Sequence, residues 1–210
     1  VSYYTVWVHQ IKTPIAAMKL ALQNEDAHAA RRLSNELFRI EQYVEMVLTY
    51  LRLNADSTDY LIKEYDLDKI IRRSVKKFAG EFIERKLTLS YTPADAQIIT
   101  DEKWLSFVIE QVLSNALKYT PSGEISVYFE NGRIVIKDTG IGIAPEDLPR
   151  IFENGYTGCN GRRDRQASGL GLYLCRQICE NLGHKISAES AVGEGTTVLI
   201  DVSRKKTVIE

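Results

Sequence analysis

Apolar residues recur every three or four positions over two long stretches near the start of the chain. Residues of about 4–23 carry one apolar stripe and residues of about 26–54 carry another, with Asn24-Glu25-Asp26 between them. This spacing is typical of amphipathic helices, and the polar segment between the stripes predicts a turn. We therefore expect an α-helical hairpin. One hairpin buries two apolar stripes poorly, so two copies should associate as a four-helix bundle.

The polar segment of residues 54–59 ends this pattern, and strands alternate with helices after it. We place a domain boundary there and expect one domain over residues 1–57 and another over residues 60–208. The mixed order favours an α/β sandwich, with helices on one face of a sheet. The predicted strands lie near 60–65, 87–91, 96–100, 124–130, 133–138, 185–190 and 196–203, and the predicted helices over 67–85, 101–116 and 171–182.

Charge and cysteine usage exclude several function classes. The 210 residues have a net charge of −1, which gives no electrostatic case for binding nucleic acid. The cysteines Cys159, Cys175 and Cys179 lack CxxC spacing, so we interpret them as reduced thiols and not as a disulfide framework or a zinc site. No apolar run reaches the length of a membrane span. Because an amphipathic helix begins almost at residue 1, we expect a piece of a longer chain.

One histidine near the start stands on a helix face with a threonine one turn later. His9 and Thr13 are four residues apart, and Pro14 removes a helical hydrogen bond to the Gln10 carbonyl, which should bend the helix beside His9. Taken alone, His9 can be a solvated or core histidine, or it can be a nucleophile. The second half of the chain decides between these interpretations.

Three glycine clusters follow predicted strands or precede predicted elements. They are Asp138-Thr139-Gly140-Ile141-Gly142-Ile143, Ser168-Gly169-Leu170-Gly171-Leu172 and Gly193-Glu194-Gly195-Thr196. Glycine lets a backbone approach a ligand closely, and a helix N-terminus offers N–H groups to anions. Each cluster alone could be an ordinary turn. The chain lacks a P-loop and a complete dinucleotide fingerprint, which disfavours two common nucleotide folds.

Together these motifs resemble a known family. The order Asn115-Ala116-Leu117-Lys118-Tyr119, Asp138-x-Gly140-x-Gly142, Phe152, Gly169-x-Gly171-Leu172 and Gly193-x-Gly195-Thr196 is similar to the N, G1, F, G2 and G3 boxes of sensor histidine kinases. Their ATP-binding domain has the GHKL (Bergerat) fold. The His9 stretch resembles their H box, and the run from Trp7 to Pro14 resembles the intramembrane-sensing, BceS-like kinases that work with peptide-antibiotic ABC transporters.

The resemblance implies ATP and Mg²⁺ as cofactors of the second domain. Asp138 should accept a hydrogen bond from the adenine amino group, and Asn115 should ligate Mg²⁺ through its amide oxygen, as hard cations prefer. Gln111 stands where many relatives have a further asparagine, and its longer amide could also reach the metal. Phe152 should anchor a lid over ATP between residues 149 and 167. The remaining residues expected to bind nucleotide are Lys118, Tyr119, Gly140, Gly142, Gly169, Leu170, Gly171, Leu172 and Thr196.

The resemblance also assigns roles on the first helix. His9 would accept the phosphoryl group, and Thr13 would orient a water that dephosphorylates the partner regulator. Gln10 departs from the glutamate or aspartate that many relatives carry. Its amide can fix the imidazole tautomer but is a far weaker base, so we expect slow basal autophosphorylation.

The function implied is that of the cytoplasmic core of a membrane-bound sensor histidine kinase. It would act as a homodimer, phosphorylate His9 and pass the group to an aspartate of a response regulator. The resemblance also implies a peptide-antibiotic ABC transporter as a further partner. One alternative is a GHKL domain of the chaperone or topoisomerase type, which the His9 hairpin disfavours. Another is a dimeric scaffold whose nucleotide site controls conformation while Gln10 leaves His9 inert.

Overall fold

The computed structural model describes residues 15–16, 18, 27–54, 60–158 and 168–203 of the chain. The chain divides into two compact units, residues 1–58 and residues 59–210. Among the described residues, no helix combines the length and the apolar character that crossing a membrane requires.

The described part of the first unit is helical. Helix α2 (Ala27–Leu53) coincides with the helix predicted over residues 26–54. The predicted first helix is represented by the helical residues Ile15, Ala16 and Met18. Four large apolar side chains of α2 are exposed at spacings of seven, three and four residues, which places them along one face of the helix. They are Leu33, Ile40, Tyr43 and Val47.

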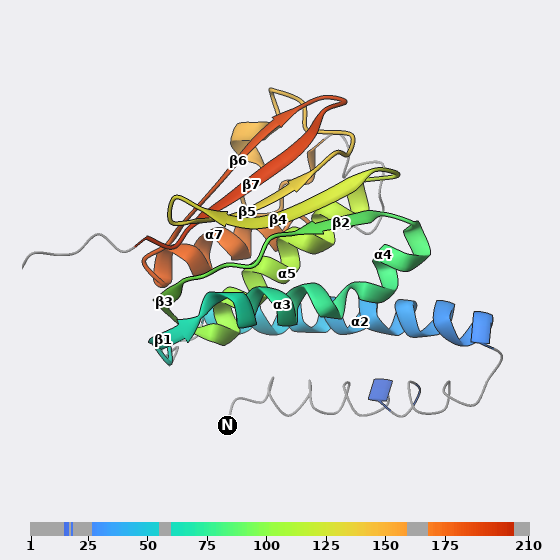
Figure 1. Ribbon diagram of the computed structural model, residues 1–210, viewed down its shortest axis with the longest axis horizontal. Coiled ribbons are helices and arrows are strands. Elements are labelled where there is room, and N and C mark those ends of the chain that lie inside the picture. Colours follow the sequence, from blue (N-terminus) through green and yellow to red (C-terminus); the bar gives the residue numbers. More distant parts are fainter. Residues whose placement is uncertain (1–14, 17, 19–26, 55–59, 159–167, 204–210) are drawn as a thin grey trace, which may run out of the picture. The chain divides into compact units, whose positions relative to one another are not determined.

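The second unit contains a five-stranded sheet and a two-stranded ribbon (Figure 1). The strands of the sheet, in spatial order, are β2 (Thr88–Tyr91), β4 (Glu124–Glu130), β5 (Arg133–Asp138), β7 (Gly195–Asp201) and β6 (Lys185–Ala191). The β2–β4 pair is parallel and the other three pairs are antiparallel. The ribbon pairs β1 (Lys63–Asp66) antiparallel with β3 (Gln97–Thr100).

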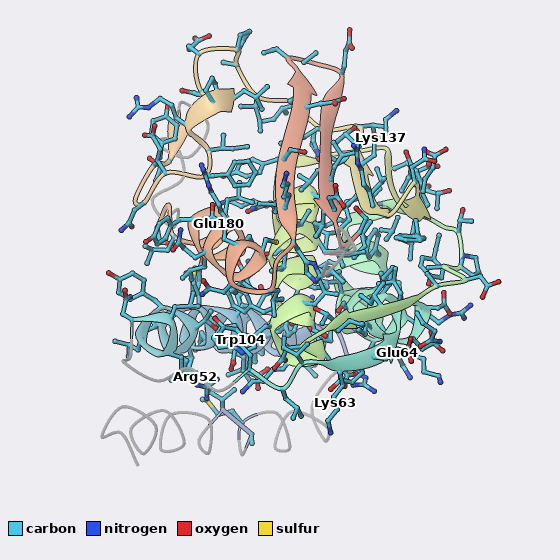
Figure 2. The ribbon with its side chains drawn as sticks, turned by 90° about the vertical axis from the view of Figure 1, so that its left-hand side faces the viewer. Arg52, Lys63, Glu64, Trp104, Lys137 and Glu180 are labelled. Atoms are coloured by element: carbon cyan, nitrogen blue, oxygen red, sulfur yellow. The ribbon has the colours of Figure 1, made fainter. Side chains whose placement is uncertain are left out.

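Helices lie on one side of this sheet, as the sequence predicts (Figure 1). They are α3 (Leu67–Lys77), α4 (Ala79–Arg85), α5 (Glu102–Tyr119) and α7 (Gly171–Asn181), with a 3-10 helix over Leu148–Arg150. In the side view, Trp104 marks α5, Glu180 marks α7 and Lys137 marks β5 (Figure 2). Fully buried side chains from the helices and the central strands form the core; the largest include Leu67, Ile70, Ile71, Leu105, Ile109, Leu113, Leu117, Ile125, Ile134, Ile136 and Leu174.

Local polar chemistry fixes several element ends. The Asp66 side chain accepts a hydrogen bond from the Lys69 N–H (3.2 Å) and so caps α3. Asp101 caps α5 by accepting from the N–H groups of Lys103 (2.9 Å) and Trp104 (3.2 Å). The β4–β5 hairpin turns at Asn131 and Gly132, whose φ angles of 51° and 77° are those of a type I′ turn. The helix starts predicted near residues 67 and 101, and the strands predicted over 124–130 and 133–138, are confirmed.

The prediction of a single helix over residues 67–85 is wrong. The helix ends at Lys77, and Phe78 has φ −96° and ψ 4°, which are not helical values. A new helix, α4, starts at Ala79. The Phe78 ring is fully buried, so the chain turns here to bring that ring into the core. The apolar spacing continues through the break and therefore gave no sign of it.

Candidate nucleotide site

The end of strand β5 holds a buried carboxylate with defined backbone partners. Asp138 Oδ1 accepts hydrogen bonds from the N–H groups of Gly140 (2.8 Å) and Thr196 (3.2 Å). The residue is only 7% exposed. Burial raises the pKa of this carboxyl above its usual range, and the two N–H donors oppose that rise. We call Asp138, Gly140 and Thr196 the Asp138 cluster.

Glycines let the backbone around the Asp138 cluster pack closely. A Cβ on Gly140 would lie 2.3 Å from the Tyr119 carbonyl oxygen, and one on Gly195 would lie 1.9 Å from the Asp138 carbonyl oxygen. The Tyr119 carbonyl also accepts from the Ile141 N–H (3.1 Å). The C-terminal end of α5 is thereby joined to the loop that follows Asp138. The Tyr119 backbone and the buried acceptor Asp138 thus meet at one place.

The other end of the candidate site is the start of α7. The N-cap residue Leu170 makes no side-chain cap, and its own N–H is donated to the Ser168 hydroxyl (3.3 Å). The N–H groups of the residues that follow can therefore face an anion. Gly169 has φ +67°, and a Cβ there would lie 2.4 Å from the Gly155 carbonyl carbon. The Gly155 N–H donates to the Gly169 carbonyl oxygen (3.1 Å). Leu170 and Leu172 are half-buried on either side of Gly171.

Helix α5 connects the two ends of the site. A Cβ on Gly171 would lie 2.9 Å from the Gln111 amide oxygen, which places this amide beside the start of α7. Gln111, Asn115 and Lys118 follow one another at helical spacing on one face of α5. The Lys118 ammonium lies over the Tyr119 ring, 5.1 Å from its centroid. From Gln111 to Tyr119 the helix rises by about 12 Å, so one helix connects the start of α7 with the Asp138 cluster.

The donor set on α5 fits Mg²⁺ in the presence of phosphates. Mg²⁺ is usually held by one or two protein oxygens together with substrate phosphates and water. The amide oxygens of Asn115 and Gln111 supply that number at neighbouring turns of one helix. Within the described part of the chain, no group of three His, Cys, Asp or Glu side chains could hold a metal without such help.

The segment after the 3-10 helix has a polar anchor that the sequence analysis missed. Tyr156 donates a hydrogen bond to the Asp147 carboxylate, which is 5% exposed. The Arg150 guanidinium stacks on the Tyr156 ring, 4.2 Å from its centroid. Phe152, the expected anchor, is itself half-buried. No local pattern marks Asp147, since its partner follows nine residues later in an irregular segment.

The structure thus brings several predicted site residues together. Asp138, Gly140 and Thr196 are directly bonded, Tyr119 lies against Gly140, and Gln111 lies against Gly171. His9, Gln10 and Thr13 lie outside the described residues. Of the three cysteines, Cys175 and Cys179 are buried free thiols, and burial raises the pKa of Cys179 to about 12.

Residues 100–206 match the family of histidine kinase-, DNA gyrase B- and HSP90-like ATPases. The match covers the Asp138 cluster, α5 and the start of α7. The chain therefore belongs to this ATPase family.

Named relatives narrow the resemblance to sensor kinases. The chain is 36% identical over 205 residues to the sensor histidine kinase YxdK of Bacillus subtilis, covering 94% of this chain and 63% of that protein. It is 34% identical over 196 residues to the sensor protein BceS of Halalkalibacterium halodurans, covering 91% of this chain and 59% of that protein. The chain thus spans less than two thirds of the length of these relatives. The resemblance to sensor histidine kinases that include BceS is confirmed.

A solved structure has the same fold. Full-length ShkA in complex with AMPPNP matches with a TM-score of 0.66 at 22% identity, over 94% of this chain and 44% of that one. At this identity the likeness shows the fold alone.

Proposed function

We propose that this chain is the catalytic core of a sensor histidine kinase. Residues 60–208 would bind ATP with Mg²⁺, and residues 1–57 would carry the phosphoryl acceptor His9. The proposal rests on two features at opposite ends of α5. One is the buried acceptor Asp138, and the other is the start of α7, which has no side-chain cap from its N-cap residue. The names of YxdK and BceS as sensor proteins support it.

Each of the described site residues has a separate role in nucleotide binding. Asp138 accepts from the adenine amino group, while Gly140 and Gly142 keep the loop close to the base and Tyr119 lines it. The N–H groups around Gly169, Leu170, Gly171 and Leu172 hold phosphate oxygens, and Lys118 adds a positive charge. Asn115, with Gln111, holds Mg²⁺, which neutralises charge on the phosphates. Phe152 fixes the segment that leads toward the phosphates.

The chemical step is phosphoryl transfer to histidine. A bond forms between an imidazole nitrogen of His9 and the γ-phosphorus, the bond to the bridging oxygen breaks, and ADP leaves. Little covalent chemistry is needed from other side chains, so positioning and electrostatics supply most of the catalysis. Gln10 orients the imidazole. The group then passes to a response-regulator aspartate. In a separate phosphatase reaction, Thr13 orients a water that hydrolyses this phosphoaspartate and releases inorganic phosphate.

Dimerisation is supported by helix α2. Its exposed face of Leu33, Ile40, Tyr43 and Val47 has the spacing of a bundle seam. A second copy of the hairpin would cover this face and complete a four-helix bundle. The resemblance of residues 7–14 to BceS-like kinases implies a peptide-antibiotic ABC transporter as a further partner, and the sensor protein BceS is among the relatives.

One labelling experiment tests the proposed kinase activity. The purified chain is incubated with γ-labelled ATP and Mg²⁺ beside His9→Ala, and the label is examined for lability in acid and stability in base. We expect such label on the wild type and none on His9→Ala. If ATP binds but neither the wild type nor Gln10→Glu becomes labelled, the kinase proposal fails and the scaffold alternative replaces it.

A further inference from the structure

Ser190, near the end of β6, has a hydroxyl group with three hydrogen-bond partners. It accepts from the Ile143 N–H (2.8 Å), donates to the Gly195 carbonyl oxygen (2.7 Å) and bonds the Thr196 hydroxyl (2.9 Å). These partners come from the loop after Asp138, from the end of the β6–β7 turn and from β7. The serine thus connects the loop after Asp138 with strands β6 and β7 beside the Asp138 cluster.

Counting protons fixes the direction of the bond between the two hydroxyl groups. A serine hydroxyl has one hydrogen and two lone pairs. Ser190 gives its hydrogen to the Gly195 carbonyl, which can only accept. In the Ser190–Thr196 bond the hydrogen must therefore come from Thr196. The remaining oxygen lone pairs of Thr196 can then only accept.

This polarity matters because Thr196 is the cross-strand partner of Asp138. The two residues are opposite each other in the β5–β7 register, and the Thr196 N–H is bonded to Asp138 Oδ1. A carboxylate and a hydroxyl held as an acceptor therefore stand on neighbouring strands at the base end of the site. Two acceptors side by side favour a ligand that offers N–H donors, such as the amino group at position 6 of adenine.

We propose that Ser190 is a positioning residue for purine selection: it holds the Thr196 hydroxyl as an acceptor and so disfavours 6-oxo purines. This inference rests on the proposed adenine-nucleotide site. Without Ser190, the Thr196 hydroxyl can rotate and donate to a 6-oxo group. Asp138 would then be the sole fixed acceptor of the pair.

The test measures dissociation constants for ADP and for inosine diphosphate by calorimetry on the full chain. Inosine diphosphate has an oxo group at position 6 and a hydrogen on N1, whereas ADP has an amino group at position 6 and no hydrogen on N1. The quantity compared is the dissociation constant for inosine diphosphate divided by that for ADP. We expect Ser190→Ala to reduce this ratio about fivefold, which corresponds to the free energy of one ordinary hydrogen bond. Ser190→Thr keeps the hydroxyl and should retain the wild-type ratio. Ser187→Ala, on an exposed position of the same strand, is the matched control and should also retain it.

The ratio separates positioning from damage to the fold. A structural loss would weaken both nucleotides equally and leave the ratio unchanged, which would overturn the proposal. If Ser190→Ala does not fold, Thr196→Val removes the acceptor while Ser190 keeps its bonds to Ile143 and Gly195, and the same fall in ratio is expected. An unchanged ratio in Thr196→Val would also overturn the proposed role of Ser190. If the wild type binds neither nucleotide, the proposed adenine site is wrong. If the wild type binds ADP but the variants keep the wild-type ratio, only the proposed role of Ser190 is wrong.

Discussion

Gly142 lies directly against the carbonyl group of Ala191. A Cβ built on Gly142 would be 2.0 Å from the Ala191 oxygen, and the glycine has φ +70°. The backbone of the loop after Asp138 therefore packs closely against the backbone at the end of β6. The Gly193 N–H strengthens the contact by donating to the Ile141 carbonyl (2.9 Å). No larger residue at position 142 can preserve this geometry.

Gly142→Ala is expected to destabilise the protein more than Gly183→Ala. Both glycines have similar positive φ angles, +70° and +74°, but a Cβ on Gly183 meets nothing within 4 Å. Gly183→Ala should cost about 1–2 kcal/mol from backbone strain alone. Gly142→Ala should cost several kcal/mol, since the clash with Ala191 adds to the same strain. Urea unfolding of the two variants gives the difference directly; equal costs would show that the loop relaxes away from Ala191.

Tyr156→Phe should weaken nucleotide binding although Tyr156 is not placed against the ligand. The substitution removes the hydrogen bond to buried Asp147 and so loosens Gly155, whose N–H holds the Gly169 carbonyl. Leaving the carboxylate without this donor should cost about 1–3 kcal/mol of folding free energy. We expect ADP affinity to fall severalfold. Tyr128→Phe on β4 is the matched control. An equal fall in ADP affinity in this variant would show that the Tyr156–Asp147 hydrogen bond has no specific role in nucleotide binding.

The parts of the fold that could be predicted are those with local causes. The Asn131-Gly132 turn, the Asp66 cap and the Asp101 cap each depend on residues within a few positions, so the sequence shows them directly. The break at Phe78 has no such local signal. It arises because a buried ring fits the core only if the helix ends, which is a tertiary effect.

In the candidate site, too, some residues can be predicted from local sequence and others depend on the tertiary fold. Motif glycines and Asp138 could be recognised because their chemistry is unusual in an ordinary strand or helix. Ser190 could not, since a serine in a strand is unremarkable and its partner Ile143 is 47 residues away. Its role depends on which loop the fold places beside it. The same holds for Asp147, whose importance appears only once Tyr156 is seen to reach it.

Gln10→Glu should raise the basal rate of autophosphorylation. A carboxylate beside His9 accepts the imidazole proton far better than an amide does, which makes the other ring nitrogen more nucleophilic. General-base assistance contributes about 10²–10⁴-fold in enzymes. Because an amide can also fix the tautomer, we expect a smaller gain, about tenfold or more. Initial rates with labelled ATP at saturating concentration measure it, and an unchanged or lower rate would contradict the prediction.

Asp138→Asn should change folding stability and nucleotide affinity in opposite directions. Because burial raises the pKa of Asp138 above its ordinary value of 3.8, the folded state favours the protonated carboxyl. The stability that this group contributes is complete below the unfolded pKa and is lost as the pH rises through the folded pKa. At pH 7 the ionised side chain therefore lowers the free energy of unfolding, whereas asparagine carries no charge.

We therefore expect the nucleotide-free Asp138→Asn variant to be at least as stable as the wild type at pH 7. Its advantage should shrink as the pH falls toward 4, because the wild-type carboxyl then becomes neutral as well. Binding should change in the opposite sense. Loss of a charged acceptor costs about 1.5–3 kcal/mol, or about 10–100-fold in ADP affinity. Urea unfolding at several pH values, with ADP calorimetry at pH 7, measures both effects. A variant that is less stable than the wild type at pH 7 and equally so at pH 4.5 would show that Asp138 serves mainly to hold Gly140 and Thr196 in place.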